Sequence, residues 1–158
     1  MPMSPFLANL RAKVGPDLIM LPSVSGFVFD AGGRLLMARH HDVGFWAAPG
    51  GGVDPDERPE DAVVRELREE LGVEVAVKAL IGVYGGPEFR VVYPNGHAVG
   101  YVTATYACTL ASGEPEPDGV EISDVRWVTE DELGTLHTTP WTPLVAPEAF
   151  AWWREHAE

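Results

Sequence analysis

The chain contains few of the residues on which several common kinds of site depend. Cys108 is its single cysteine, which excludes an internal disulfide, a thiolate zinc site and an iron–sulfur cluster. Lysine and arginine number 11 against 24 aspartate and glutamate residues, so the net charge is −13. Nucleic-acid polymers and anionic membranes bind basic surfaces, and this balance therefore argues against both partners. A phosphorylated small molecule stays compatible, because bound cations can reverse the local charge.

The sequence also lacks long apolar segments. No run approaches the roughly 20 apolar residues of a transmembrane helix. The N-terminal stretch MPMSPFLANLRAKVG lacks the charged and apolar regions of a secretion signal, so a cytoplasmic protein is expected. With 158 residues, 46% hydrophobic and 22% charged, the composition is that of a globular protein, and we predict one domain spanning residues 1–158.

Hydrophobic spacing and turn residues predict helices alternating with strands. Helices are expected at about 4–14, at 59–71 between Pro59 and the capping Gly72, and from Pro147 to the C-terminus. Strands are expected at 24–30, 34–39, 73–86 and 125–128, with two more joined by the turn Pro94-Asn95-Gly96. Residues 49–52 are expected to form a glycine-rich loop. This order predicts an α/β fold, an α/β/α sandwich with a mixed sheet covered by helices on both faces.

The predicted helix at 59–71 carries three glutamates on one side. At 100° per residue, Glu66, Glu69 and Glu70 fall within an arc of roughly 100°, beside the apolar face. Like charges at these spacings repel and raise one another's pKa near a core, a conflict that a divalent cation such as Mg²⁺ resolves. The alternative is a solvated acidic face that Arg65 and Arg68 partly neutralise. The preceding glycine-rich loop favours a ligand site.

In this segment the sequence resembles the Nudix hydrolases. Their signature is G-x5-E-x7-R-E-U-x-E-E-x-G-U, where U is a bulky aliphatic residue. Its defined positions are filled over 23 residues by Gly51, Glu57, Arg65, Glu66, Leu67, Glu69, Glu70, Gly72 and Val73. Trp46 and the downstream VRWVTEDEL also look like Nudix landmarks, so the resemblance covers the whole domain. One position departs from the pattern: Arg58 stands where a serine or threonine N-cap is frequent, and it cannot accept a hydrogen bond.

The resemblance implies an enzyme that hydrolyses a diphosphate bond in a nucleoside diphosphate derivative, with Mg²⁺ or Mn²⁺ as cofactor. The partner is then a small-molecule nucleotide, and a homodimer is left open. By the family pattern, Glu69 and Glu70 are the principal metal ligands. The Gly50 carbonyl is a further ligand, and Glu57 is an auxiliary one.

The resemblance also assigns the catalytic candidates. Glu66 binds metal or serves as general base, and Arg65 orients it. Some members have a fourth acid six residues before the tryptophan of the last strand, which here gives Glu121 as metal ligand or base. The alternative for Glu121 is a solvated loop acid.

Two other functions use the same fold. Isopentenyl diphosphate isomerisation needs an active-site cysteine in its own motif, and Cys108 in YACTL lies outside such a context. A non-catalytic nucleotide-sensing module generally adds a DNA-binding domain or loses signature glutamates, and this chain does neither. Catalysis is therefore favoured.

The substrate is left open within one class. Members similar to ADP-ribose pyrophosphatases tend to have a proline about fifteen residues beyond the signature, and Pro87 lies fourteen beyond Val73. The compact size equally suits a nucleoside-triphosphate pyrophosphohydrolase of the MutT type, including one that removes oxidised nucleotides. Several aromatic residues could stack on a base, although aromatic residues on strands usually belong to the core.

Overall fold

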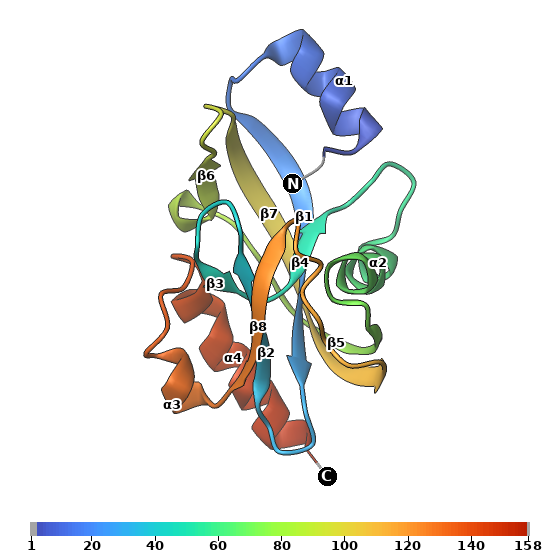
Figure 1. Cartoon of the computed structure of the whole chain (residues 1–158), viewed down its shortest axis with the longest axis vertical. Coiled ribbons are helices and arrows are strands. Elements are labelled where there is room, and N and C mark those ends of the chain that lie inside the picture. Colours follow the sequence, from blue (N-terminus) through green and yellow to red (C-terminus); the bar gives the residue numbers. More distant parts are fainter. Residues whose placement is uncertain (1–2, 158) are drawn as a thin grey trace.

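The centre of the protein is a mixed sheet of eight strands, seen in a computed structural model that describes residues 3–157 (Figure 1). Strands β1 (Ile19–Phe29) and β7 (Ala98–Ser112) run parallel in its middle. Strand β2 (Leu35–His40) pairs antiparallel with β1, and β5 (Glu74–Tyr84) pairs antiparallel with β7. The short strands β3 (Trp46–Ala47), β4 (Gly50–Gly52), β6 (Arg90–Val92) and β8 (Ile122–Val128) join β2, β1, β7 and β2 respectively.

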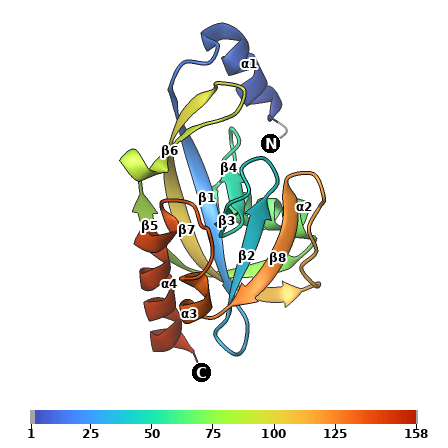
Figure 2. The same cartoon turned by 60° about the vertical axis from the view of Figure 1, so that its left-hand side comes forward.

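Helices cover both faces of this sheet, as Figures 1 and 2 show from two sides. Helix α2 (Pro59–Leu71) lies on one face, and α4 (Thr142–His156) with the short α3 (Glu130–Leu133) lies on the other. Helix α1 (Pro5–Val14) sits at one end of the sheet, and a 3-10 turn η1 (Pro87–Phe89) precedes β6. The arrangement confirms the predicted α/β/α fold with a mixed sheet. None of the helices within residues 3–157 is long and apolar enough to cross a membrane.

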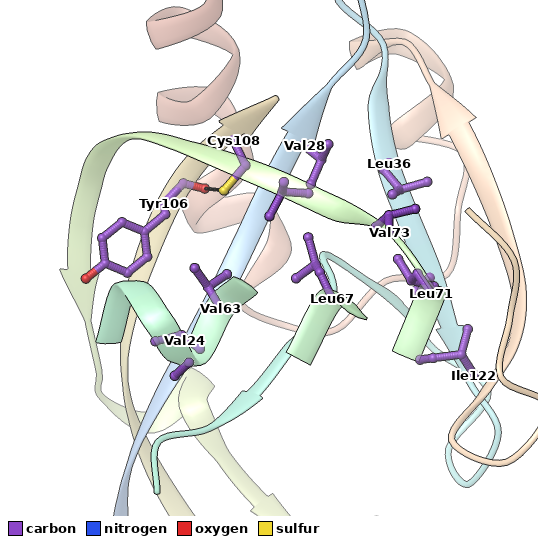
Figure 3. Close-up of a cluster of buried hydrophobic side chains, with 13 residues drawn as sticks. Val24, Val28, Leu36, Val63, Leu67, Leu71, Val73, Tyr106, Cys108 and Ile122 are labelled. Atoms are coloured by element: carbon purple, nitrogen blue, oxygen red, sulfur yellow. Dashed lines mark hydrogen bonds between the residues drawn. The ribbon is translucent and has the colours of Figure 1, made fainter. Parts of the chain in front are cut away.

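Two hydrophobic clusters hold these layers together. On the α2 face, Val63, Leu67 and Leu71 are buried against β1 and β2 (Figure 3). On the α4 face, Phe29 meets Phe150 edge to face, with ring centroids 5.3 Å apart. Each fully buried leucine or phenylalanine contributes about 1.5–3 kcal/mol to stability. Helix α2 is therefore fixed on the sheet, and its glutamates are fixed with it.

The helix at Pro59–Leu71 has the predicted limits, but three other predictions need correction. Strand β1 begins at Ile19 rather than residue 24, because its parallel pairing with β7 starts there. The C-terminal helix begins at Thr142, and Pro147 lies inside it rather than at its start. Proline inside a helix loses one hydrogen bond and crowds the carbonyl of residue i−4, and the buried residues of α4, among them Val145, Ala149 and Phe150, offset that cost. The expected glycine loop is the strand β4, paired with residues 23–25 of β1.

Candidate active site

The loop that leads into α2 is organised by a carboxylate. Arg58 occupies the N-cap position and makes no side-chain capping hydrogen bond, as its chemistry predicts. Instead, Glu57 Oε2 accepts a hydrogen bond from the Asp54 backbone N–H at 3.0 Å. Pro59 then begins the helix, because its ring already fixes φ at a helical value. The start of α2 therefore depends on Glu57. The same residue belongs to the carboxylates around Arg65, with Glu66 and Glu69, which we call the acidic group.

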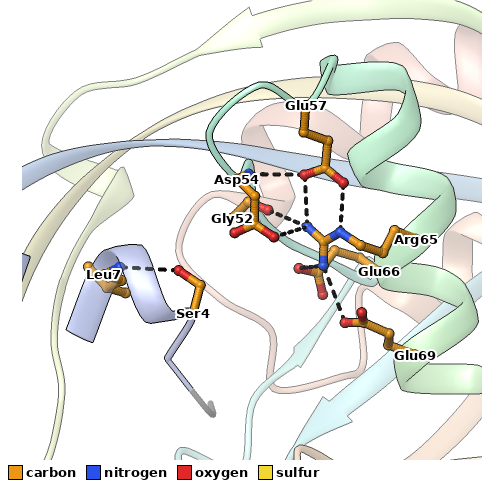
Figure 4. A network of polar contacts seen from close by, with 8 residues as sticks. All are labelled: Ser4, Leu7, Gly52, Asp54, Glu57, Arg65, Glu66 and Glu69. Carbon is orange, nitrogen blue, oxygen red and sulfur yellow. Dashed lines mark hydrogen bonds and ion pairs between the residues drawn. The ribbon is translucent and has the colours of Figure 1, made fainter. Parts of the chain in front are cut away.

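Arg65 is the centre of this group, which Figure 4 shows in close-up. Its guanidinium forms a two-pronged pair with Glu57, with Nε–Oε1 at 2.6 Å and Nη2–Oε2 at 3.0 Å. The remaining nitrogen, Nη1, donates to Glu66 Oε1 at 2.9 Å and to Glu69 Oε2 at 3.2 Å. Hydrogen bonding from Arg65 lowers the pKa of Glu57, and the same contact raises the pKa of Arg65. A fourth pairing, from Nη2 to Asp54 Oδ2 at 3.7 Å, was not predicted from the sequence.

The three glutamates on one side of α2, Glu66, Glu69 and Glu70, differ sharply in exposure. Glu66 and Glu70 are only 8% and 2% exposed, whereas the side chain of Glu69 is 59% exposed. Burial raises the pKa of Glu66 to about 7, against the opposing effect of the Arg65 charge. Burial also raises the pKa of Glu70 well above its ordinary value, and the nearby charges of Glu66 and Glu121 add to the rise. The predicted repulsion is thus present, but desolvation is the larger cause.

Glu70 has a feature that fits a bound cation. Its Oε2 accepts a hydrogen bond from the Gly50 N–H at 3.3 Å. Its Oε1 is buried and has no hydrogen-bond partner among the residues that the structure describes. A desolvated carboxylate oxygen without a partner is costly, and a divalent cation with hard oxygen ligands would satisfy it. Gly50 therefore contacts Glu70 by a hydrogen bond from its N–H. A ligand role for the Gly50 carbonyl stays a prediction.

The carboxylates do not form a finished metal cage as they stand. Within residues 3–157, no three histidine, cysteine, aspartate or glutamate side chains converge in a way that could hold an ion. Instead, the Arg65 guanidinium donates hydrogen bonds to Glu57, Glu66 and Glu69. Three of the predicted ligands therefore share one arginine as their cation.

Two of the three glycines of strand β4 are required by atoms that lie close to them. A Cβ on Gly50 would lie 2.1 Å from the Val24 carbonyl oxygen. A Cβ on Gly51 would lie 2.5 Å from Glu66 Oε1 and 2.7 Å from its Oε2. Next to them, a Cβ on Gly52 would meet nothing within 4 Å. The close approach of backbone and carboxylate therefore explains the first two glycines, and not the third.

We expect Gly51→Ala to lower turnover about tenfold, because the new methyl group must displace the Glu66 carboxylate from its present position. Steady-state kinetics of purified protein would measure the change. Gly52→Ala is the matched control and should turn over normally, because a Cβ there meets nothing within 4 Å. Gly51 and Gly52 both lack a positive φ, so alanine strains the backbone at neither position. Equal activity of the two variants would show that the position of Glu66 beside β4 does not matter.

Glu121 is held near the same site by a loop before β8. Asp118 Oδ1 accepts hydrogen bonds from the backbone N–H groups of Val120, Glu121 and Ile122 at 2.9, 3.0 and 2.9 Å. The Asp118 N–H in turn donates to the Glu70 carbonyl oxygen at 3.1 Å. Burial raises the pKa of Glu121, with the charges of Asp118 and Glu69 adding to it. Asp118 was missed in the sequence, where only the Asp-Gly turn signal at 118–119 could have indicated it.

An aromatic pocket opens beside the acidic group. Its volume is about 140 Å³, and Gly50 and Gly51 form part of its wall. The ring of Phe89 stacks on that of Trp141 at 5.7 Å between centroids, and both rings line the pocket. Two tryptophans do not line it: Trp46 is buried against Arg39 and Arg126, and Trp127 packs in the α2 core. A flat apolar ligand can therefore lie next to the buried glutamates.

Comparison with known proteins identifies the family of this chain. The NUDIX domain profile matches residues 20–150. A MutT-like protein from Streptomyces ambofaciens is 39% identical over 128 residues, which cover 81% of this chain and 75% of that protein. The nucleoside triphosphatase NudI of Enterobacter is 33% identical over 104 residues, covering 64% and 73%. An isopentenyl-diphosphate Delta-isomerase from Klebsiella pneumoniae is 34% identical over 135 residues, covering 79% and 71%.

Solved structures agree with the fold. An ADP-ribose pyrophosphatase from Streptococcus suis superposes with a TM-score of 0.69 at 24% identity, covering 87% of this chain and 96% of that one. At this identity the likeness concerns the fold alone. The profile match, by contrast, spans the mixed sheet, the glycine strand and the acidic helix together. The chain belongs to the Nudix family and is a hydrolase of acid anhydrides.

Proposed function

We propose that the protein is a metal-dependent pyrophosphohydrolase that cleaves the diphosphate bond of a nucleoside diphosphate derivative and releases a nucleoside monophosphate. The observation that carries this proposal is the buried pair Glu66 and Glu70, placed beside Gly50 and Gly51, which line an aromatic pocket. Glu66 and Glu70 would hold cations that neutralise the polyphosphate, and the base would enter the pocket.

The metal ligands in this proposal are the oxygen donors gathered near α2. They are Gly50, Glu57, Glu66, Glu69, Glu70 and Glu121. Family members generally use divalent metal ions, and these hard oxygen donors suit Mg²⁺, with Mn²⁺ as a second candidate. When bound, the ions neutralise phosphate oxygens and lower the pKa of water.

The chain's own residues hold and move protons. Arg65 fixes the Glu66 carboxylate at 2.9 Å and compensates the charges around it. Glu66 and Glu121 are the two candidates for the general base, because both have raised pKa values that bring them nearer to neutral pH. Glu121 is the more exposed of the two, so it has the better access to a water molecule.

Isomerase activity is the second candidate to be tested, since one relative has that name. The chemistry of Cys108 speaks against it. This thiol is fully buried in the α2 core, and burial raises its pKa to about 12. A protonated thiol enclosed by valine and leucine side chains cannot reach a substrate.

A substrate panel with product identification tests the proposed function. Nucleoside triphosphates, ADP-ribose and dinucleoside polyphosphates should each give a nucleoside monophosphate if they are substrates, whereas monophosphate esters should react poorly. In ¹⁸O-labelled water, one label should appear on a product phosphate. A label on a sugar carbon, or conversion of isopentenyl diphosphate to its isomer, would contradict the proposal. A single domain over residues 1–158, a cytoplasmic location and a homodimer also stay predictions.

A further inference from the structure

Three aromatic rings from three different elements form a column beside the aromatic pocket. Trp141, at the N-cap position of α4, and Phe89, in η1, stack with an angle of 20° between their rings. Tyr84, the last residue of β5, continues the column, with its ring centroid 6.3 Å from that of Phe89 and an interplanar angle of 14°. Trp141 and Phe89 line the pocket, whereas Tyr84 does not. Any effect of Tyr84 on a ligand in this pocket must therefore pass through Phe89.

Helix α4 holds this column at both ends. The Tyr84 hydroxyl donates a hydrogen bond to Oε2 of Glu148, an exposed residue of α4 that lies 64 residues further along the chain. Helix α4 contacts β5 (Figure 2), and the same helix carries Trp141 at its N-cap. The contacts therefore close a ring through Trp141, Phe89, Tyr84, Glu148 and the helix. We call these four residues the aromatic clamp.

The hydrogen bond between Tyr84 and Glu148 keeps its direction at neutral pH. Burial raises the pKa of Tyr84, and the Glu148 carboxylate adds to the rise. The hydroxyl is therefore protonated and donates, and its acceptor is a carboxylate. A hydrogen bond to a charged acceptor is stronger than one between neutral groups.

Strand β5 is shaped to the Tyr84 ring. A Cβ on Gly82 would lie 2.9 Å from the Tyr84 hydroxyl oxygen and 3.0 Å from its Cζ. Gly82 is not among the glycines with positive φ, so the backbone conformation does not require glycine there. The space above Gly82 is instead filled by the ring of Tyr84, in the position from which it reaches both Phe89 and Glu148.

Phe89 lies in a segment that is too short to fix its ring alone. The 3-10 turn η1 has three residues, and such turns have poorer hydrogen-bond geometry than an α-helix. Gly86 just before it has a φ of 115°, a value that glycine adopts readily. The Phe89 side chain is nevertheless buried, with rings stacked against it on both sides. Its position in the pocket wall therefore depends on Tyr84 and Trp141.

From these contacts we propose that Glu148 and Tyr84 are positioning residues for the nucleobase, which hold Phe89 and Trp141 as a preformed wall of the aromatic pocket. The inference rests on the proposed function, in which the base enters this pocket. A wall that is ordered before binding loses less entropy when the ligand arrives. The aromatic clamp should therefore strengthen binding of the nucleoside part of a ligand and leave binding of its diphosphate unchanged.

The test compares ligands that share a phosphorus–carbon–phosphorus bridge and differ by the nucleoside. Methylenediphosphonate has no nucleoside, whereas the α,β-methylene analogues of ADP, GDP and UDP each have one. This bridge resists hydrolysis, and calorimetry with Mg²⁺ gives the dissociation constants. The native chain should bind its best nucleotide analogue at least about tenfold more tightly than methylenediphosphonate. We call this ratio the nucleoside gain.

Variants of the pair separate its hydrogen bond from its bulk. Tyr84→Phe keeps the ring and loses the donor, and Glu148→Ala loses the acceptor, so each should lower the nucleoside gain about fivefold. Glu148→Gln can still accept the bond and should keep most of the gain. The double variant Tyr84→Phe, Glu148→Ala should lose no more than either single variant, because both changes remove the same interaction. Glu155→Ala, at another exposed glutamate of α4, is the matched control and should keep the gain.

The outcomes distinguish the aromatic clamp from the catalytic proposal. Equal affinity of the native chain for methylenediphosphonate and all three nucleotide analogues would overturn the inference. So would an unchanged nucleoside gain in Tyr84→Phe and Glu148→Ala, with circular dichroism confirming that both variants fold. In that second case the proposed function stands if the native chain still hydrolyses nucleotides. If the gain falls as expected but no diphosphate is cleaved, the proposed function fails while the aromatic clamp stands.

Discussion

Glu70→Gln should lower turnover by about a thousandfold, the scale expected when several kcal/mol of charge stabilisation are removed. Glutamine has the same shape and can still accept the Gly50 hydrogen bond, so the fold should survive. Chelator should likewise abolish activity of the native chain, and Mg²⁺ should restore it. In the native chain Mg²⁺ should also raise the melting temperature, because a ligand that binds only the folded state stabilises it. The variant should lose most of this rise.

Two measurements, turnover and the Mg²⁺-dependent melting temperature, make this result interpretable. Glu74→Gln is the matched control, since Glu74 pairs with Arg68 on the surface outside the site. Surface ion pairs contribute about 1 kcal/mol or less, so both measurements should resemble those of the native chain. A Glu70→Gln protein with normal turnover, or with an undiminished response to Mg²⁺, would remove Glu70 from the proposed ligands.

Glu121→Gln should lower turnover about a hundredfold if Glu121 is the general base, which is the usual contribution of a positioned base. The loop fold should be retained, because Asp118 accepts its hydrogen bonds from backbone N–H groups and not from the Glu121 side chain. The quantity to measure is kcat at saturating substrate and Mg²⁺.

Glu116→Gln provides the comparison for this prediction, since Glu116 is an exposed acid of the same loop. Its kcat should be unchanged. Near-normal kcat in Glu121→Gln would return Glu121 to the status of a solvated loop acid. Glu66, whose carboxylate Arg65 orients, would then be the preferred base.

The features that local sequence determines were predicted well. Helix α2 has the predicted limits because proline at its start and glycine at its end act within a few residues. The spacing of Glu66, Glu69 and Glu70 likewise placed them on one side of this helix. Spacing alone could not divide them into two buried residues and one exposed residue, since that depends on how β4 lies against the helix.

The features that depend on distant residues were not predicted. The parallel pairing of β1 with β7 joins segments about 80 residues apart, and hydrophobic pattern carries no information on such partners. Asp118 gains its position from the loop geometry and from the end of α2. The pocket between α1 and the turn that joins β6 to β7 needs both segments at once, so neither segment indicates it alone.

The buried state of Cys108 has a practical consequence for spectroscopy. It is the only cysteine in the chain, and at neutral pH a thiol with a pKa of about 12 is almost entirely protonated and unreactive. A thiol-reactive fluorophore or spin label would therefore react with an engineered surface cysteine and hardly at all with Cys108. Ala8→Cys would place such a probe on the exposed side of α1. Its signal during titration would show directly whether this helix moves when a nucleotide substrate binds.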